Sequence, residues 1–379
     1  MQLRYNFRVY PNADQCTDLA RAFGCSRVVY NDALRARETA RAQGEAFPKT
    51  GELSTRLITQ AKGTEERSWL GEVCSVILQQ SLRDLDTAYR NFFASLKGKR
   101  KGPKVGRPRF KSRKDHRQSI RFTANARWKI TDQGKLWLPK VGEVKVKWSR
   151  ALPSAPSTVT VIKDAAGRYF ASFVVETDDT PLRESADDVG IDLGLGHFAV
   201  LSDGTKVSNP RFLRRAEKKL RKAQKDLSRK REGSNNRARA RVKVARARAG
   251  VADARREFHH QLSTRIVREN QAVFVEELCV KGLGRTRLAK SVHDAGWSAF
   301  VGMLEYKAQR YGRTFVKVGR FLPSSQTCSV CWVVDGPKPL HVRTWTCSGC
   351  ATVHDRDVNA SRVVLAAGRK LAPGREAES

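Results

Sequence analysis

Apolar and polar residues alternate from residue 2 to residue 10, and this period of two predicts one strand over Gln2–Tyr10. Runs of strand-forming residues, each separated from the next by a turn, recur over 119–123, 128–130, 135–138, 143–148, 158–163 and 169–175. Several short strands at such spacing are typical of a small barrel. We therefore expect a β-barrel composed of residues 1–10 and 117–182.

Between these strands the apolar residues follow a helical period. A stripe with intervals of four and three predicts a helix with one side in a core, and it consists of Leu78, Leu82, Leu85, Tyr89, Phe92 and Leu96. Residues 97–117 are rich in lysine, arginine, glycine and proline, and they predict a basic connecting segment. We expect residues 11–116 to form a helical domain and linker inserted into the barrel.

The pattern changes after the acidic, polar segment 178–188. Apolar strands are predicted over 189–193, 198–201, 272–275 and 314–318, with helices around 297–311 and 358–367. Leucine and alanine residues repeat at intervals of seven within 211–256, which predicts a pair of basic helices with a narrow apolar seam. We expect residues 183–320 and 352–367 to form an α/β domain and the tail 368–379 to be disordered.

The charge of the chain is strongly one-sided. Its 379 residues include 73 Lys and Arg against 38 Asp and Glu, a formal net charge of +35. Such an excess favours a polyphosphate partner, because each basic residue at a phosphate releases condensed counterions. A ribosomal-type scaffold, a non-specific binder or a protein at an anionic membrane could carry the same excess. There is no run of about 18 apolar residues and no signal-peptide pattern, so we expect a cytoplasmic protein without disulfides and without a membrane partner.

Basic side chains are concentrated in the connecting segment and in the basic helices. A solvated surface is the ordinary reason for such runs, but the excess here has one sign and favours a nucleic-acid groove. The candidate contacts are Lys99, Arg100, Lys101, Lys104, Arg107, Arg109, Lys111, Lys218, Lys219, Arg221, Lys222, Arg229, Lys230, Arg231, Arg239 and Arg241.

Four of the eight cysteines form two pairs with two residues inside each pair: Cys328 and Cys331, then Cys347 and Cys350. Thiolates at this spacing can face one tetrahedral ion, and four sulfurs leave no open position for water. A redox motif is the alternative, but two successive pairs disfavour it. We expect 321–351 to be a zinc ribbon that holds one structural Zn²⁺ and performs no chemistry.

Three acidic residues carry the catalytic hypothesis. Asp192 lies in an apolar strand, Glu276 ends a second one, and Asp357 lies at the start of the last helix. Singly, they could be a turn residue, a surface acid and an N-cap, and Glu277 and Asp355 compete for the last two places. Together they are the ligands that two Mg²⁺ ions about 4 Å apart require to hydrolyse a phosphodiester.

Several motifs resemble the transposon-encoded TnpB (OrfB) proteins, RNA-guided nucleases related to the type V CRISPR effectors. They occur in the family's order across 190–367: Gly-Ile-Asp-Leu-Gly at 190–194, Val-Glu-Glu-Leu at 275–278, Asp-Ala-Gly-Trp at 294–297, Pro-Ser-Ser-Gln-Thr-Cys at 323–328, the paired cysteines, and His-Asp-Arg-Asp-Val-Asn-Ala at 354–360. The N-terminal half matches more loosely.

The resemblance implies an α+β multidomain protein: a wedge-like β-barrel with an inserted helical recognition domain, followed by a RuvC-type, RNase H-like α/β nuclease domain with an inserted zinc ribbon. In the family the last catalytic acid precedes the asparagine by two residues, which selects Asp357 over Asp355. The resemblance also implies Mg²⁺ or Mn²⁺ at the acids, a guide RNA from the transposon end, and a short motif beside the DNA target. Gln79 and Gln80 are weak candidates for reading that motif, because amide side chains can read adenine edges.

The resulting prediction is an RNA-guided, metal-dependent DNA endonuclease that associates with the nucleoid when it binds DNA. Two alternatives remain open at this point. One is a nucleic-acid-binding regulator or guided repressor without catalysis, and the other is a transposase that uses the same acids for strand transfer.

Overall fold

The computed structural model describes residues 1–115, 117–339 and 341–372. The chain divides into two compact units, Met1–Thr177 and Asp178–Ser379. In the described part of the chain, no helix is both long enough and apolar enough to cross a membrane.

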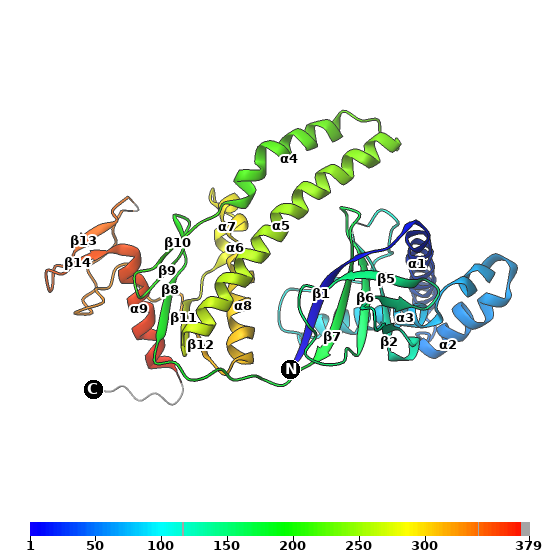
Figure 1. Ribbon diagram of the computed structural model, residues 1–379, viewed down its shortest axis with the longest axis horizontal. Coiled ribbons are helices and arrows are strands. Elements are labelled where there is room, and N and C mark those ends of the chain that lie inside the picture. Colours follow the sequence, from blue (N-terminus) through cyan, green and yellow to red (C-terminus); the bar gives the residue numbers. More distant parts are fainter. Residues whose placement is uncertain (116, 340, 373–379) are drawn as a thin grey trace. The chain divides into compact units, whose positions relative to one another are not determined.

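The first unit contains a curled seven-stranded antiparallel sheet (Figure 1). Its strand order is β2-β6-β7-β1-β5-β4-β3. The strands are β1 (Gln2–Tyr10), β2 (Gln118–Thr123), β3 (Lys129–Ile130), β4 (Leu136–Leu138), β5 (Gly142–Lys147), β6 (Thr158–Lys163) and β7 (Tyr169–Glu176). β2 and β3 are the two edge strands, and the described residues show no hydrogen-bonded pairing between them. The sheet is therefore curled but open, where a closed barrel was expected.

The helices of the first unit follow β1 in the chain and precede β2. They are α1 (Ala13–Ala42), α2 (Thr50–Ser54) and α3 (Ser75–Leu96), with the short turns η1 (Thr55–Gln60), η2 (Ala61–Gly63) and η3 (Glu65–Glu72), while η4 (Ala124–Ala126) follows β2. Asn12 and Gln15 form a reciprocal capping box at the start of α1. The stripe on α3 is buried at Leu78, Leu82 and Leu85, but Leu96 is 68% exposed because it lies in the last turn of the helix.

The second unit is built on a five-stranded sheet in the order β10-β9-β8-β11-β12. Its strands are β8 (Asp188–Asp192), β9 (His197–Leu201), β10 (Lys206–Ser208), β11 (Ala272–Glu276) and β12 (Thr314–Val318). β11 runs parallel to both β8 and β12, whereas β9 is antiparallel to β8. Parallel neighbours end at the same edge of a sheet, and this edge carries the candidate acids.

Helices cover both faces of this sheet. Val273 and Val275 of β11 pack in the core shared with α5 (Asn235–Glu269) and α8 (Trp297–Arg310). Phe274 belongs to the core on the opposite face, with Val364 of α9 (Arg356–Leu371). Figure 1 shows α9 on the side of the sheet away from α5 and α8. The short helices α6 (Val280–Leu283) and α7 (Ala289–Ala295) precede α8, and β13 (Thr344–Thr346) and β14 (Val353–Asp355) precede α9.

The predicted basic helices are α4 (Phe212–Ser228) and α5, which form a long hairpin (Figure 1). α4 has no fully buried residue, as a narrow seam implies. α5 continues to Glu269, well past the expected end near residue 256. The basic surface pattern ends near residue 256, but Leu262 and Ile266 pack in the core of the second unit and extend the helix over the sheet.

The expected disordered tail from Gly368 is wrong for its first residues, because α9 continues to Leu371. Gly368 packs against Phe274 so closely that an added Cβ would lie 2.2 Å from Cδ1 of the ring. Tertiary packing therefore extends the helix through a residue of low helix propensity. Residues 373–379 of the expected tail lie outside the described residues.

Candidate active site and metal centre

Asp192 and Glu276 are the last residues of two adjacent parallel strands. Ile191 of β8 pairs in register with Val275 of β11, so the two acids follow at the same edge of the sheet. Side chains alternate between faces along a strand. Because Ile191 and Val275 face the core under α5 and α8, this alternation places Asp192 on the face that α9 covers. Glu276, at the very end of β11, also lines a hollow of about 230 Å³ with Ser298 and Val301 of α8.

α9 approaches this face closely because of Gly190. A Cβ at that position would lie 2.1 Å from the carbonyl oxygen of Ser361. Glycine therefore allows the first half of α9 to lie directly on β8. Asp357 is in the first turn of α9, so the helix brings the third acid to the ends of the two strands.

The electrostatics of Asp192 reflect this convergence. Burial raises the pKa of its carboxyl group to about 7, and the nearby charges of Asp357 and Glu276 act in the same direction. Arg356 and Arg343 oppose the rise without cancelling it. Burial also raises the pKa of Glu276. The site therefore has more negative charge than its own cationic side chains neutralise.

The three carboxylates do not form a closed cluster. In the described residues, the group whose potential ligand atoms all lie within 4.8 Å of one another is the set of four cysteines. An arginine and a histidine flank Asp357 instead: Arg343 Nη1 is 3.4 Å from Oδ1, and His197 Nδ1 is 3.9 Å from Oδ2. Neither residue was predicted, because nothing in the sequence distinguishes this arginine or this histidine from the others in the chain.

The two rival acids are placed differently. Asp355 is the N-cap of α9, where it accepts a hydrogen bond from the amide of Val358, and it pairs with Lys206 Nζ at 2.6 Å. Burial would raise the pKa of Asp355, but the Lys206 hydrogen bond and the helix amides together lower it. Glu277 is exposed and does not contribute to the pKa shift of Asp192. The geometry therefore favours Glu276 and Asp357.

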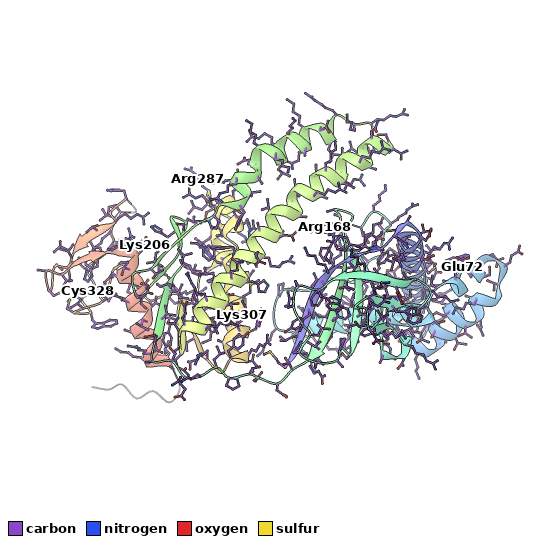
Figure 2. The ribbon with its side chains drawn as sticks, in the orientation of Figure 1. Glu72, Arg168, Lys206, Arg287, Lys307 and Cys328 are labelled. Carbon is purple, nitrogen blue, oxygen red and sulfur yellow. The ribbon has the colours of Figure 1, made fainter. Side chains whose placement is uncertain are left out.

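The four predicted zinc ligands lie together in the segment that carries β13 and β14, where Cys328 is labelled in Figure 2. The Sγ atoms of Cys328 and Cys350 are 3.6 Å apart, and those of Cys331 and Cys347 are 3.5 Å apart. A tetrahedral zinc with bonds of about 2.3 Å separates its sulfurs by about 3.8 Å. Amide hydrogen bonds to two of the sulfurs complete a donor set that fits Zn²⁺.

The cysteine cluster is tied directly to the helix that carries Asp357. Asn359 is 1% exposed, and its side chain donates to the carbonyl of Thr327 at 2.7 Å and accepts from the amide of Ser329 at 2.8 Å. These two bonds attach the backbone on either side of Cys328 to α9. His354, on β14, places Nε2 3.0 Å from Cys328 Sγ. A change in the cluster is therefore transmitted to the first turn of α9.

Three profiles of known families match the chain. OrfB_IS605, described as "Probable transposase", matches residues 172–287, and the "Cas12f1-like, TNB domain" matches residues 297–364. A protein of Streptomyces pristinaespiralis named "Putative RNA-guided DNA endonuclease" is 46% identical over 369 residues, covering 96% of this chain and 89% of the relative. The chain belongs to the TnpB (OrfB) family.

A more distant relative agrees with this assignment. "Putative RNA-guided DNA endonuclease InsQ" of Escherichia coli (strain K12) is 29% identical, with 97% of this chain and 92% of the relative covered. Among solved structures, the protein in "Cryo-EM structure of the Cas12f1-sgRNA-target DNA complex" is similar with a TM-score of 0.52 and 14% identity. The similarity covers 91% of this chain and 81% of that one, and it concerns the fold.

The third profile, described as "Helix-turn-helix domain", matches residues 1–46. In this TnpB-family chain those residues include β1 and one helix, α1, which is uninterrupted over Ala13–Ala42. The segment therefore does not present a separate recognition helix of the helix-turn-helix kind.

The predicted basic contacts are almost all exposed. A hollow of about 610 Å³ lies between α4 and α5, and among its lining residues are Lys219, Lys222 and Arg229 of the predicted set, together with Lys225, Lys243 and Arg246, which were missed. Lys111 is an exception: it lies over the ring of Tyr30 at 4.0 Å, and burial lowers its pKa. Its charge is held within the first unit and is less available to a phosphate.

Gln79 and Gln80 also differ in their exposure. Gln79 is exposed on α3, whereas Gln80 is 5% exposed and lies in the interior. A base edge cannot reach Gln80 in this conformation, so Gln79 alone stays a candidate reader.

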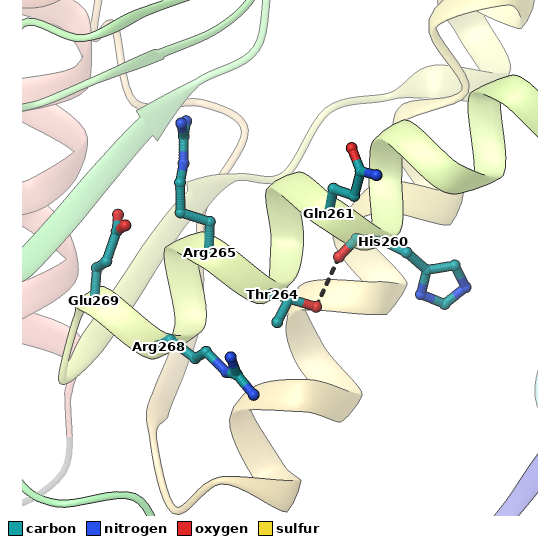
Figure 3. Close-up of a pocket in the computed structure, with 6 residues that line it drawn as sticks. All are labelled: His260, Gln261, Thr264, Arg265, Arg268 and Glu269. Carbon is teal, nitrogen blue, oxygen red and sulfur yellow. Dashed lines mark hydrogen bonds between the residues drawn. The ribbon is translucent and has the colours of Figure 1, made fainter. Parts of the chain in front are cut away.

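A broad surface hollow of about 540 Å³ lies on one side of α5, and Figure 3 shows its six lining residues on that single helix. Thr264 donates to the carbonyl of His260 at 2.7 Å, so part of its polarity is satisfied within the helix. None of the predicted acids lines this hollow, and it is not a candidate for the hydrolytic site.

Proposed function

We propose that this protein is an RNA-guided DNA endonuclease of transposon origin, whose RuvC-like hydrolytic site consists of Asp192, Glu276 and Asp357. The proposal is supported by the family, by the names of its relatives and by the convergence of the three acids at one edge of the second unit's sheet. The five-stranded sheet with α5 and α8 on one face and α9 on the other serves as the RNase H-like domain.

The observation that carries the proposal is the uncompensated charge at Asp192. A carboxyl group whose pKa is raised by burial and by two neighbouring acids needs a cation to be ionised at neutral pH. Divalent Mg²⁺, a hard ion that prefers carboxylate oxygens, would supply a nucleophilic water at neutral pH and stabilise the leaving oxygen. Asp192 and Glu276, at the strand ends, and Asp357, in the first turn of α9, would hold these ions.

Arg343 has a second role in this proposal. Its guanidinium now lies beside Asp357, where it offsets part of the negative charge of the acids. Its side chain is 61% exposed, so with the carboxylates held by divalent ions this guanidinium would be available to a phosphate of the substrate.

Base pairing with a guide RNA supplies the choice of sequence, and the protein holds the backbone. The basic hollow between α4 and α5 and the connecting segment 97–117 fit this task, because their exposed cations are not tied to particular bases. A guide RNA that pairs with one target then confers specificity on a largely electrostatic surface.

Neighbouring glutamates allow a matched test. The protein is purified with its RNA and incubated with guide-matched plasmid DNA that carries randomised flanking sequence, in Mg²⁺ or in EDTA. We expect cleavage in Mg²⁺ only, loss of cleavage in Glu276→Gln, and wild-type cleavage in Glu277→Gln, because the second acid is exposed. Equal activity of the two variants would contradict the site, and no cleavage of matched DNA by the wild type would contradict the function. Joined rather than cut DNA ends would indicate a transposase.

A further inference from the structure

A second cavity lies beside the loop that follows Asp192. It encloses about 270 Å³, and its wall includes Leu195 and Gly196, which come directly after the Asp-Leu-Gly segment of the catalytic strand. The guanidinium-bearing residues Arg211 and Arg214, at the start of α4, also line it. A cavity that combines the catalytic loop with two arginines is suited to a phosphate close to the point of cleavage.

The charge of this cavity is positive. Asp294 is the acid in its wall, but its carboxylate is already bound by Arg255 Nη2 at 2.9 Å and by the amide of Leu213 at 3.0 Å. In the described part of the chain, neither Arg211 nor Arg214 has an acidic partner within 4.0 Å. Both guanidinium charges are therefore available to an anion. The α4 terminus is not the site itself, since Asp294 occupies its amide.

Both arginines are held in place by the surrounding structure. Arg214 Nη2 donates to Ser291 Oγ at 3.1 Å. Arg211 has the left-handed backbone conformation, with φ 49° and ψ 49°, and its amide donates to Asn209 Oδ1 at 3.2 Å. Asn209 in turn donates to the carbonyl of Leu195, which joins this arginine to the catalytic loop.

The conformation of Arg211 is costly. A residue with a Cβ is disfavoured in the left-handed region, and such strain persists only where the surrounding contacts enforce it. Glycine would be the unstrained choice at this position. Arginine at this position adds to the cavity wall a positive charge that glycine would not supply.

We propose that Arg211 and Arg214 form a phosphate subsite that anchors the DNA strand being cut, near the scissile bond. The inference rests on the proposed nuclease function and assigns it a substrate group: one backbone phosphate of a single strand that enters the hydrolytic site. The loop 194–196, fixed by Asn209, sets the spacing between this phosphate and Asp192.

The test combines variants with charge-neutral substrates. Arg214→Ala is compared with Arg215→Ala, a neighbouring exposed arginine that does not line the cavity. Guide-matched DNA is prepared with a single methylphosphonate linkage, which removes one phosphate charge, at successive positions around the cut. RNA-guided binding is measured in EDTA, and cleavage in Mg²⁺.

In the wild type and in Arg215→Ala, we expect neutralisation of one particular linkage to slow cleavage about 10- to 100-fold. Arg214→Ala should cleave unmodified DNA slower by a similar factor and show no further loss at that linkage, while guided binding changes less than about twofold. If Arg214→Ala responds to every linkage as the wild type does, the subsite is refuted while the nuclease function stands. If the wild type cuts no guide-matched DNA, the proposed function fails, and the subsite with it.

Arg211→Gly separates a functional role from a structural one. Because glycine relieves the backbone strain, this variant should melt at or above the wild-type temperature. Its cleavage should nevertheless fall and lose sensitivity to the same linkage. A variant with wild-type cleavage would remove Arg211 from the subsite.

Discussion

The second unit contains two sets of side chains suited to metal ions, and they differ in how closely their ligand atoms lie together. The four sulfurs lie within 4.8 Å of one another, at separations of 3.5 and 3.6 Å that already approach those around a tetrahedral zinc. The charges of Glu276 and Asp357 help to raise the pKa of Asp192, but the three carboxylates do not share such a cluster.

The difference follows from charge. Thiols can approach one another as neutral groups, and the second cysteine pair lies in the short loop between β13 and β14. Carboxylates repel one another when ionised, and these three come from two strands and a distant helix. The sulfurs therefore lie in one compact cluster, whereas the ligand atoms of the proposed catalytic acids lie further apart. Asn359 connects the two sites mechanically.

The largest effect is expected when an acid is removed. Asp192→Ala should reduce guided DNA cleavage by at least about 10³-fold, because the carboxylate between the two other acids is lost. RNA-guided binding to the target should stay within about twofold of the wild type. Asp203→Ala, in the exposed turn between β9 and β10, is the matched control and should cleave normally. Cleavage by Asp192→Ala within about tenfold of the wild type would contradict the site.

The next largest effect is expected from the zinc ribbon. Cys347→Ser should lose the zinc, about one ion per chain by elemental analysis, and reduce cleavage about 10²-fold, because the brace on Asp357 is removed. Cys279→Ser, at an exposed cysteine outside the cluster, should retain both. A zinc-free protein with full cleavage would show that the two sites are independent.

A smaller effect is expected when only the connection between the sites is cut. Asn359→Ala leaves the carbonyl of Thr327 and the amide of Ser329 without their partner, at a cost of about 1–3 kcal/mol. We expect cleavage to fall about tenfold while the zinc content is unchanged. Unchanged cleavage in a zinc-loaded variant would rule out the mechanical link.

The smallest effect concerns stability without metal. Folding raises the pKa of Asp192 from its ordinary value of 3.8 to about 7, so the folded state holds a proton that the unfolded chain releases between these pH values. The contribution of Asp192 to stability therefore falls as pH rises through this range, and the penalty is complete above about pH 7. Asp192→Asn never ionises and should be more stable than the wild type by about 1 kcal/mol at pH 8 in EDTA, or roughly 2–4 °C in Tm.

The sign of that difference can be checked across pH. At pH 5 the advantage of Asp192→Asn should shrink, because the wild-type carboxyl group is largely protonated in the fold. A difference that grows toward acid pH would mean that Asp192 is stabilised by its charge, contrary to the account. Millimolar Mg²⁺ should also stabilise the wild type at pH 8 and leave Asp192→Asn little changed.

Much of the fold was predictable where a single periodicity dominates. The strand Gln2–Tyr10 has the predicted bounds because every second residue is apolar, and β6 and β12 also match because apolar runs end at turn residues. Bounds were wrong where tertiary contacts decide them. α5 continues beyond the end of its basic sequence pattern, to Glu269. Gly368 is helical because it packs against the ring of Phe274.

The candidate site was only partly predictable for a similar reason. Asp192 and Glu276 could be predicted because an acid in or at the end of an apolar strand is unusual. The choice of Asp357 over Asp355 depended on the family resemblance. Arg343 and His197 could not be found, since their importance depends only on their distances from Asp357. The sequence pattern alone did not show that Gln80, a weak candidate for motif readout like Gln79, is buried.

The most direct test of the central claim is to locate the ions. Crystals of the RNA-bound protein soaked in Mn²⁺ should give anomalous difference peaks among the three acids, each within about 2.3 Å of carboxylate oxygens from at least two of Asp192, Glu276 and Asp357. Peaks at the four cysteines or the solvent surface only, with the three carboxylates still apart, would contradict metal-dependent hydrolysis at this site.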